Sequence, residues 1–80
     1  MSVILKALAH PVRLRMAEGL AICECNVDKM VKRLGLPQST VSQHLKTLKD
    51  SGILVSRKDG VKSCYCVKDT GIKKLLRALK

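Results

Sequence analysis

The stretch that decides the fold runs from Leu36 to Leu48 and reads LPQSTVSQHLKTL. Its apolar residues Val41, Leu45 and Leu48 recur at spacings of four and three, which predicts a helix with one buried stripe. The rest of the helix carries mainly amides, hydroxyls and an imidazole, unlike the glutamate and lysine mixture of an ordinary solvated helix. Side chains of this kind can read base edges in a DNA major groove, so we predict a recognition helix.

The residues before this stretch predict the other half of a helix-turn-helix. Lys29 to Leu34 form a short amphipathic helix, for which Asp28 is the expected N-cap. Gly35 ends that helix, and Leu36-Pro37 makes the turn into the next one. This succession of helix, glycine turn and helix is typical of a DNA-binding helix-turn-helix.

Further helices and strands complete a winged helix-turn-helix. By residue number, the expected elements are helices over 3–8, 11–20 and 71–80 and strands over 21–27, 53–57 and 61–67. Lys58-Asp59-Gly60 joins the last two strands, because Asp-Gly is a strong hairpin signal. Asp69 or Thr70 is the expected cap of the last helix. We therefore predict a mainly α fold with a small β-wing, as a single domain over residues 1–80, that dimerises through its terminal helices.

The composition fits a small basic protein that binds a polyanion. The 80 residues carry a formal charge of +10, and nucleic acid is the first partner that such a charge suits. With no Phe or Trp and one Tyr, the core must be aliphatic, and so small a core would gain from a partner subunit.

Other classes of protein are not expected from the sequence. No stretch approaches the roughly 18 apolar residues of a membrane span. No signal-peptide pattern is visible either, so we expect a cytoplasmic protein. The sequence also lacks a nucleophile–base pair, a glycine-rich phosphate loop and paired carboxylates, and we do not expect an enzyme.

The candidate DNA contacts fall on the predicted recognition helix and on the wing. A glutamine amide can pair with adenine, while hydroxyls and lysines can bond to bases or phosphates. The candidates on the helix are Gln38, Ser39, Thr40, Ser42, Gln43, His44 and Lys46. The candidates on the wing are Arg57, Lys58 and Lys62. His44 has two possible roles, as a donor to a phosphate or as a residue packed beside Leu45.

Four cysteines fall in two Cys-x-Cys pairs, Cys23 with Cys25 and Cys64 with Cys66. Residues two apart on a strand point to the same face, and each pair lies on a predicted strand. If the first short strand pairs with the last one, four sulfurs lie side by side. They could hold a thiophilic ion, close as disulfides or exchange persulfides. The alternative is four small, half-buried residues without a chemical role.

The sequence resembles the ArsR/SmtB metalloregulatory repressors over nearly its whole length. Leu5–Arg15 is similar to the family's opening helix pair, and Leu36–Lys46, Leu48 and Ser51–Leu54 are similar to its recognition helix and first wing strand. Ile22–Val27 resembles the Cys-x-Cys sensing motif of the arsenic- and cadmium-type members. The resemblance implies a homodimeric repressor that leaves its operator DNA when an inducer binds, with As(III), Cd(II) or Zn(II) as the first choice of ion.

The sequence departs from the family's pattern at two places. The family's motif usually has an apolar residue between the cysteines, and Glu24 stands there in this chain. The last helix lacks the histidine and acidic ligands of the family's zinc site, because only Asp69 remains near that position. A zinc site across the dimer is therefore not expected.

Taken together, these features predict a repressor whose operator binding is relieved by a thiophilic metal or metalloid at Cys23, Cys25, Cys64 and Cys66. One alternative is a redox or persulfide sensor that uses the same cysteines. Another is a DNA-binding module without a sensor, in which the four cysteines hold a structural zinc. A winged helix that binds proteins is a further alternative, distinguished by DNA binding that is weak and independent of salt.

Overall fold

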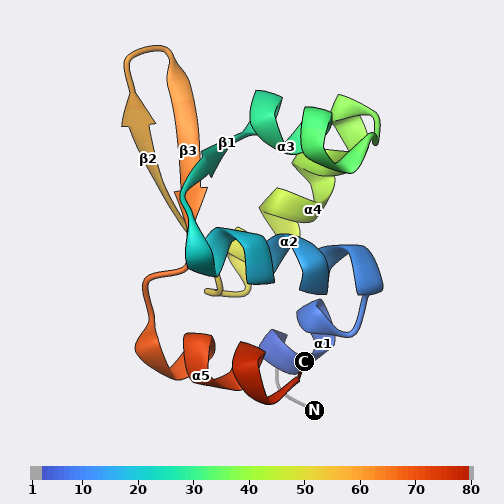
Figure 1. Ribbon diagram of the computed structural model, residues 1–80, viewed down its shortest axis with the longest axis vertical. Coiled ribbons are helices and arrows are strands. Elements are labelled where there is room, and N and C mark those ends of the chain that lie inside the picture. Colours follow the sequence, from blue (N-terminus) through green and yellow to red (C-terminus); the bar gives the residue numbers. More distant parts are fainter. Residues whose placement is uncertain (1–2, 80) are drawn as a thin grey trace.

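A computed structural model describes residues 3–79 and places five helices around a small sheet (Figure 1). In chain order the elements are α1 (Val3–Leu8), α2 (Pro11–Ile22), β1 (Cys25–Asn26), α3 (Val27–Leu34), α4 (Gln38–Asp50), β2 (Val55–Asp59), β3 (Lys62–Cys66) and α5 (Thr70–Ala78). The order confirms the predicted mainly α fold with a β-wing.

The apolar stripe of α4 forms the centre of the core, as its spacing predicts. Val41, Leu45 and Leu48 are each at most 1% exposed and belong to one cluster with Met16 and Leu20 of α2. Burying an aliphatic side chain of this size stabilises the fold by about 1.5–3 kcal/mol. The packing therefore fixes the rotation of α4 and turns its opposite face outward.

Helix α2 is longer, and β1 is shorter, than the sequence predicts. The helix continues past Gly19 to Ile22, and the backbone N–H of Cys23 donates to the carbonyl of Gly19 at 3.0 Å. Only Cys25–Asn26 remains for the strand. The expectation of a strand over 21–27 is therefore wrong for most of its length.

The helix-turn-helix forms where it is predicted, with a different cap on its first helix. Asn26 caps α3 by accepting a hydrogen bond from the backbone N–H of Lys29 at 2.9 Å, so the expectation that Asp28 is the cap is wrong. Gly35 ends α3 with a φ of 68°, a left-handed conformation that glycine adopts without strain. The next helix, α4, follows Pro37 and has no side-chain cap.

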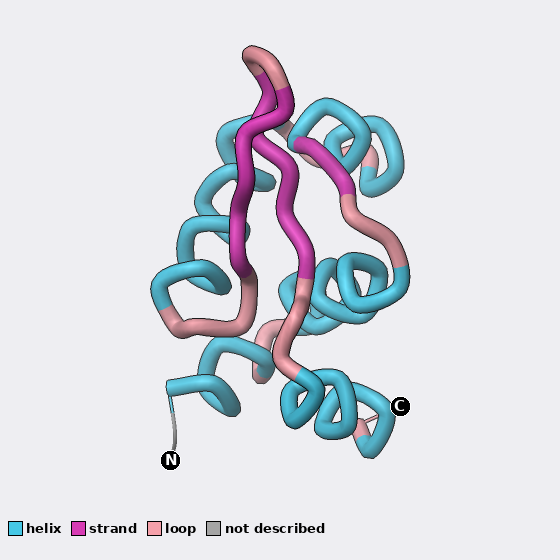
Figure 2. The backbone as a smooth tube through the Cα atoms, turned by 90° about the vertical axis from the view of Figure 1, so that its left-hand side faces the viewer, coloured by secondary structure: helices cyan, strands magenta, loops and turns pink. Residues whose placement is uncertain are grey.

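The three strands form an antiparallel sheet in the order β1-β3-β2 (Figure 2). The first strand thus pairs with the last, as predicted. In the hairpin Asp59 pairs with Lys62, which leaves Gly60 and Val61 as a two-residue loop. Gly60 has a φ of 66°, and a first loop residue with positive φ is the glycine position of a type II′ turn. The turn is therefore one residue later than Lys58-Asp59-Gly60 suggests.

Both terminal helices, α1 and α5, lie at the end of the molecule opposite the wing (Figure 1). Asp69 caps α5, as predicted, by accepting hydrogen bonds from the backbone N–H groups of Gly71 and Ile72 at 2.8 and 3.1 Å. Lys80, the end of the predicted helix, lies outside the described residues. None of the helices within residues 3–79 is long and apolar enough to cross a membrane.

Candidate nucleic-acid interface

The outer face of α4 carries polar side chains that the fold leaves unused. Gln38, Ser39, Ser42, Gln43 and Lys46 are exposed. Within residues 3–79, no hydrogen bond to the protein involves the side chains of these five residues. Their donors and acceptors are therefore free to take an external partner.

Two other polar residues of α4, Thr40 and Thr47, are less available to an external partner. The hydroxyl of Thr47 donates to the carbonyl of Gln43 at 3.1 Å within the same helix. Thr40 is half-buried in the first turn. The helix thus exposes its free polar groups, while Val41 and Leu45 are buried.

His44 packs against another histidine at the beginning of α2. The ring centroids of His44 and His10 are 4.7 Å apart, and His10 also caps α2 by accepting a hydrogen bond from the backbone N–H of Val12 at 3.2 Å. Partial burial lowers the pKa of His44, and the neighbouring His10 and Arg13 lower it further. Of the two roles open to His44 in the sequence, the structure favours packing, although its partner is His10.

The wing carries its candidate cations in two settings. Lys58 and Lys62 are exposed close to the hairpin loop, and strand alternation places them on opposite faces of the hairpin. Arg57 makes a two-pronged ion pair with Glu24, with N–O distances of 2.6 and 2.8 Å. The hydrogen bond from Arg57 holds the pKa of Glu24 below its usual value, and Lys68 adds to the effect.

In the sequence Glu24 is visible only as a departure from a motif, and its role in the fold is not predicted. Glu24 immediately precedes β1, and Arg57 lies on β2, which is the strand on the other side of β3. The ion pair therefore links the two outer strands across the central one. An acidic residue where an apolar one is usual was the available signal, but the sequence does not name its partner, 33 residues away.

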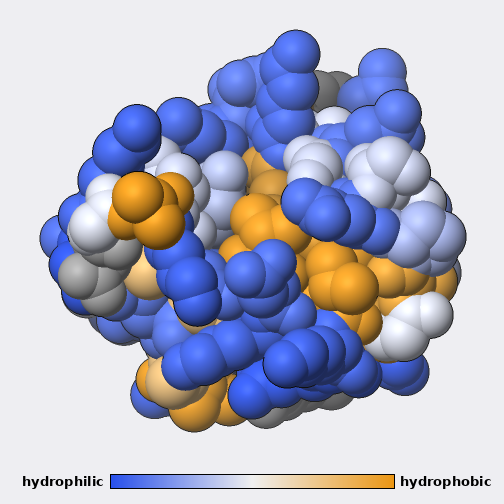
Figure 3. All heavy atoms as spheres, turned by 90° about the horizontal axis from the view of Figure 1, so that it is seen from above, coloured by the Kyte–Doolittle hydropathy of each residue, from blue (hydrophilic) through white to orange (hydrophobic). Residues whose placement is uncertain are grey.

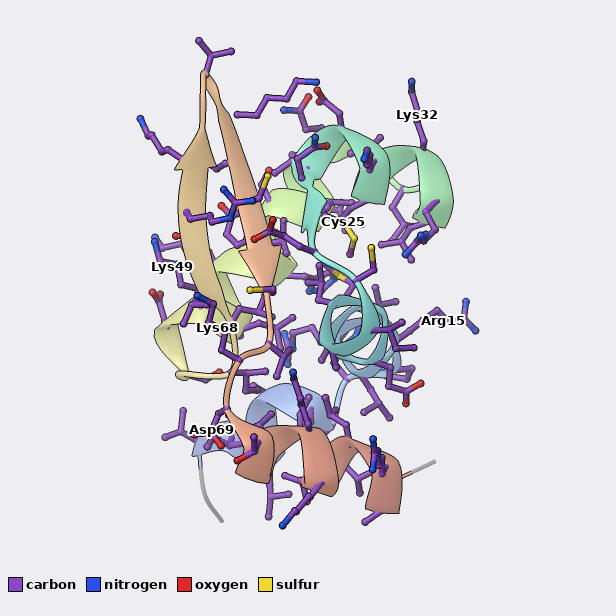
Figure 4. The ribbon with its side chains drawn as sticks, turned by 60° about the vertical axis from the view of Figure 1, so that its left-hand side comes forward. Arg15, Cys25, Lys32, Lys49, Lys68 and Asp69 are labelled. Atoms are coloured by element: carbon purple, nitrogen blue, oxygen red, sulfur yellow. The ribbon has the colours of Figure 1, made fainter. Side chains whose placement is uncertain are left out.

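The four cysteines do not form one cluster. Cys23 is the exposed C-cap of α2, and Cys25 points from β1 into the interior with 5% of its surface exposed (Figure 4). Cys64 and Cys66 are half-buried on β3. The expectation that Cys23 and Cys25 share one strand and one face is wrong, because α2 extends into the residues that the strand would need.

All four thiols are free, and the described part of the chain, residues 3–79, holds no group of three or more His, Cys, Asp or Glu side chains placed to bind a metal ion. Asp69, the remaining acidic residue of the last helix, uses its carboxylate as the cap of α5.

Seen from the wing end, the surface is mostly polar and charged, with apolar residues gathered in its middle (Figure 3). The tip of the hairpin is an exception, since Val61 is 99% exposed beside Lys62. This end of the molecule therefore combines free hydrogen-bonding groups on α4 with exposed cations on the wing.

A family model described as bacterial regulatory protein, arsR family, matches residues 10–56 of the chain. An HTH-type transcriptional regulator of Methanocaldococcus jannaschii, MJ1325, is 36% identical over 78 residues, which span 92% of this chain and 84% of that protein. The biofilm growth-associated repressor of Agrobacterium fabrum is 35% identical over 78 residues, which span 98% of this chain and 67% of the repressor.

Solved structures of transcriptional regulators are also similar to this chain in fold. Reduced HlyU from Vibrio cholerae, a protein named as a transcriptional activator, superposes with a TM-score of 0.89 at 35% identity, over 96% of this chain and 81% of HlyU. The homodimeric winged helix-turn-helix DNA-binding domain of Mb0332 from Mycobacterium bovis gives a TM-score of 0.89 at 27% identity, over 96% of this chain and 71% of that one.

Proposed function

The chain belongs to the arsR family of bacterial regulatory proteins, and from this premise we propose that it is a homodimeric repressor of double-stranded operator DNA. Transcriptional regulation is common to the relatives, whereas the sign of regulation differs among them, because they include named repressors and a named activator. A thiophilic ion at the cysteines relieves the repression.

The observation that carries the proposal is the division of α4 into two faces. Val41, Leu45 and Leu48 hold the helix in the core, while Ser42 and Gln43 point away from it with free polar groups. A glutamine amide can bond bidentately to adenine in the major groove, and a serine hydroxyl accepts several base partners. The outer face of α4 therefore reads the operator sequence.

The remaining contacts position the protein on the DNA backbone. Lys46 on α4 and Lys58 and Lys62 on the wing are exposed ammonium groups that neutralise phosphates. Gln38, Ser39 and Thr40, in the first turn of α4, contact bases or phosphates beside them. Arg57 contributes only when its pairing with Glu24 opens. We assign His44 to the contact with His10 and not to DNA.

Dimerisation places two recognition helices on one operator. The terminal helices expose apolar side chains, with Val3 67%, Leu5 41% and Leu79 44% exposed, at the end away from the wing. The Mycobacterium bovis domain of the same fold is homodimeric. In a two-fold dimer the two α4 helices must reach successive major grooves, about 34 Å apart.

The proposal is tested by fluorescence anisotropy with DNA from the promoter of the chain's own gene. Gln43→Ala is expected to weaken operator binding by about 1–3 kcal/mol and to relax specificity at one base position. Lys46→Ala is expected to weaken binding to all sequences and to lower the salt slope by about one. Arg15→Ala removes an exposed cation of α2, which points away from the sheet, and serves as the control (Figure 4).

If Gln43→Ala and Lys46→Ala bind operator as tightly as Arg15→Ala does, the assignment of α4 as the reading element is wrong. Induction is tested separately, by titrating the protein–operator complex with arsenite, cadmium, zinc, peroxide and polysulfide. Release by an ion supports metal control, and release by peroxide or polysulfide alone supports disulfide or persulfide chemistry instead.

A further inference from the structure

We propose that Cys64 and Cys66 alone form a two-thiolate site on the outer face of the wing, which takes a soft cation of linear, two-coordinate geometry such as Cu(I) or Hg(II). The ion held by Cys64 and Cys66 is then the ligand that relieves the repression proposed above. Its effect on DNA binding rests on that proposed function, but its binding to the two thiolates does not.

The strand register separates these two thiols from Cys25. Cys25 pairs with Tyr65, and Asn26 pairs with Cys64. Directly paired residues share a face of the sheet, and successive residues alternate between faces. Cys25 therefore lies with Tyr65 on the buried face, while Cys64 and Cys66 lie together on the other face. The sheet itself stands between the two sets of sulfur atoms.

The spacing along β3 favours a bridging ion over a disulfide. Residues two apart on an antiparallel strand have Cα atoms at most about 6.8 Å apart. This is the upper end of the Cα separations found in disulfides, which cluster at about 5.5–6 Å, so closing sulfurs to about 2.05 Å would strain the extended strand. Two metal–sulfur bonds of about 2.3 Å span about 4.6 Å between sulfurs. Cys64 and Cys66 can reach this separation while β3 stays extended.

The number of ligands selects the ion. Within the described residues 3–79, no third His, Cys, Asp or Glu is placed to complete a site with these thiols. Tetrahedral Zn(II) takes four ligands, and pyramidal As(III) takes three sulfurs. Thiolates favour soft ions, and Cu(I) and Hg(II) are the soft ions that two thiolates alone satisfy. Each thiol releases its proton to solvent as its metal–sulfur bond forms.

The surroundings of the pair are open and cationic. A shallow cavity lined by Val55, Ser56, Arg57, Cys66 and Lys68 gives an ion access to the sulfur of Cys66. Arg57 is the direct strand partner of Cys64. A bis-thiolate complex of Cu(I) carries one negative charge, which Arg57 and Lys68 balance.

The same charge explains how the ion acts on the wing. The guanidinium of Arg57 now pairs with Glu24 across β3. An anionic complex at Cys64 gives Arg57 a second negative partner on the same face of the sheet. The link between Glu24 and β2 weakens as a result, and the wing changes its position relative to α4.

The test is a titration of the reduced full chain with Hg(II), and with Cu(I) against a competing chelator, under nitrogen. We expect one ion per chain, a sulfur-to-metal charge-transfer band, and two sulfur neighbours by X-ray absorption. Cys64→Ser and Cys66→Ser are each expected to lose about 100-fold or more in affinity, because the second bond is no longer intramolecular. Cys23→Ser is the matched control and should bind as the wild type does.

Three sulfur neighbours in the wild-type complex would overturn the proposal, and this measurement does not depend on any variant folding. Unchanged affinity in Cys64→Ser and Cys66→Ser would overturn it as well. Operator binding is measured separately with the ion-free protein, so a failure of the DNA proposal is seen independently. Operator release by Cu(I) in the wild type, but not in Cys64→Ser, supports the coupling through the wing, because the bis-thiolate complex of Cu(I) is anionic whereas that of Hg(II) is neutral.

Discussion

The chain contains the Cys-x-Cys motif twice, and the fold gives the two copies different surroundings. In the first copy Cys23 is an exposed helix cap and Cys25 is a core residue of β1. In the second copy Cys64 and Cys66 are both half-buried and lie on one face of β3. The difference separates two thiols that can act together from two that cannot.

A spacing of two residues predicts a shared face only where a strand covers both of them. Helix α2 continues to Ile22, and its last turn draws in Cys23 through a hydrogen bond to Gly19. The strand that follows contains only Cys25–Asn26. The strand β3 instead runs through both Cys64 and Cys66.

The largest expected difference is in the rates at which the thiols react. Cys23 is exposed, whereas Cys25 can be reached only when the core around β1 opens. An opening free energy of about 3 kcal/mol slows alkylation about 100-fold. Pulse labelling with N-ethylmaleimide, read by peptide mass spectrometry, should show Cys23 modified first and Cys25 last, with Cys64 and Cys66 between them. Equal rates for Cys23 and Cys25 would contradict the buried position of Cys25.

A smaller difference is expected in stability. Cys25→Ser places a hydroxyl in an apolar site, and burying such a group without a partner costs about 1–3 kcal/mol. Cys23→Ser makes the same chemical change on the surface and should stay within about 0.5 kcal/mol of the wild type. Urea denaturation of the reduced proteins measures both values. If the two variants lost the same stability, the two residues of the first motif would not differ in burial.

Local patterns in the sequence predicted the helix-turn-helix and its recognition helix. The stripe of Val41, Leu45 and Leu48 depends only on the helical repeat, and the end of α3 at Gly35 depends on one backbone angle. The cap of α5 at Asp69 is likewise set by the next few residues. Each signal acts within a few residues, so tertiary contacts had little opportunity to override it.

The features that sequence patterns missed depend on contacts between distant residues. Glu24 meets Arg57, and His10 meets His44, only because the folded chain brings their elements together. The end of α2 was also missed, because residues 21–23 carry no glycine or proline to stop the helix. Two additional helical residues were enough to separate Cys23 from Cys25.

The smallest expected effect concerns the ion pair that connects the two motifs, since Glu24 stands between Cys23 and Cys25 and Arg57 is the strand partner of Cys64. Because Arg57 holds the pKa of Glu24 below its usual value, the pair stabilises the folded state at neutral pH. That contribution is lost as the pH falls through the lowered pKa of Glu24.

Glu24→Gln should therefore be slightly less stable than the wild type at neutral pH, because it lacks this charge on the folded protein. The gap should close as the pH falls through the lowered pKa of Glu24, where the carboxylate becomes protonated. Urea midpoints measured from pH 7 downward test this, and added salt should narrow the gap at pH 7, because exposed ion pairs are screened. Parallel pH profiles for the two proteins would mean that the Glu24–Arg57 ion pair does not contribute to the stability of the folded state.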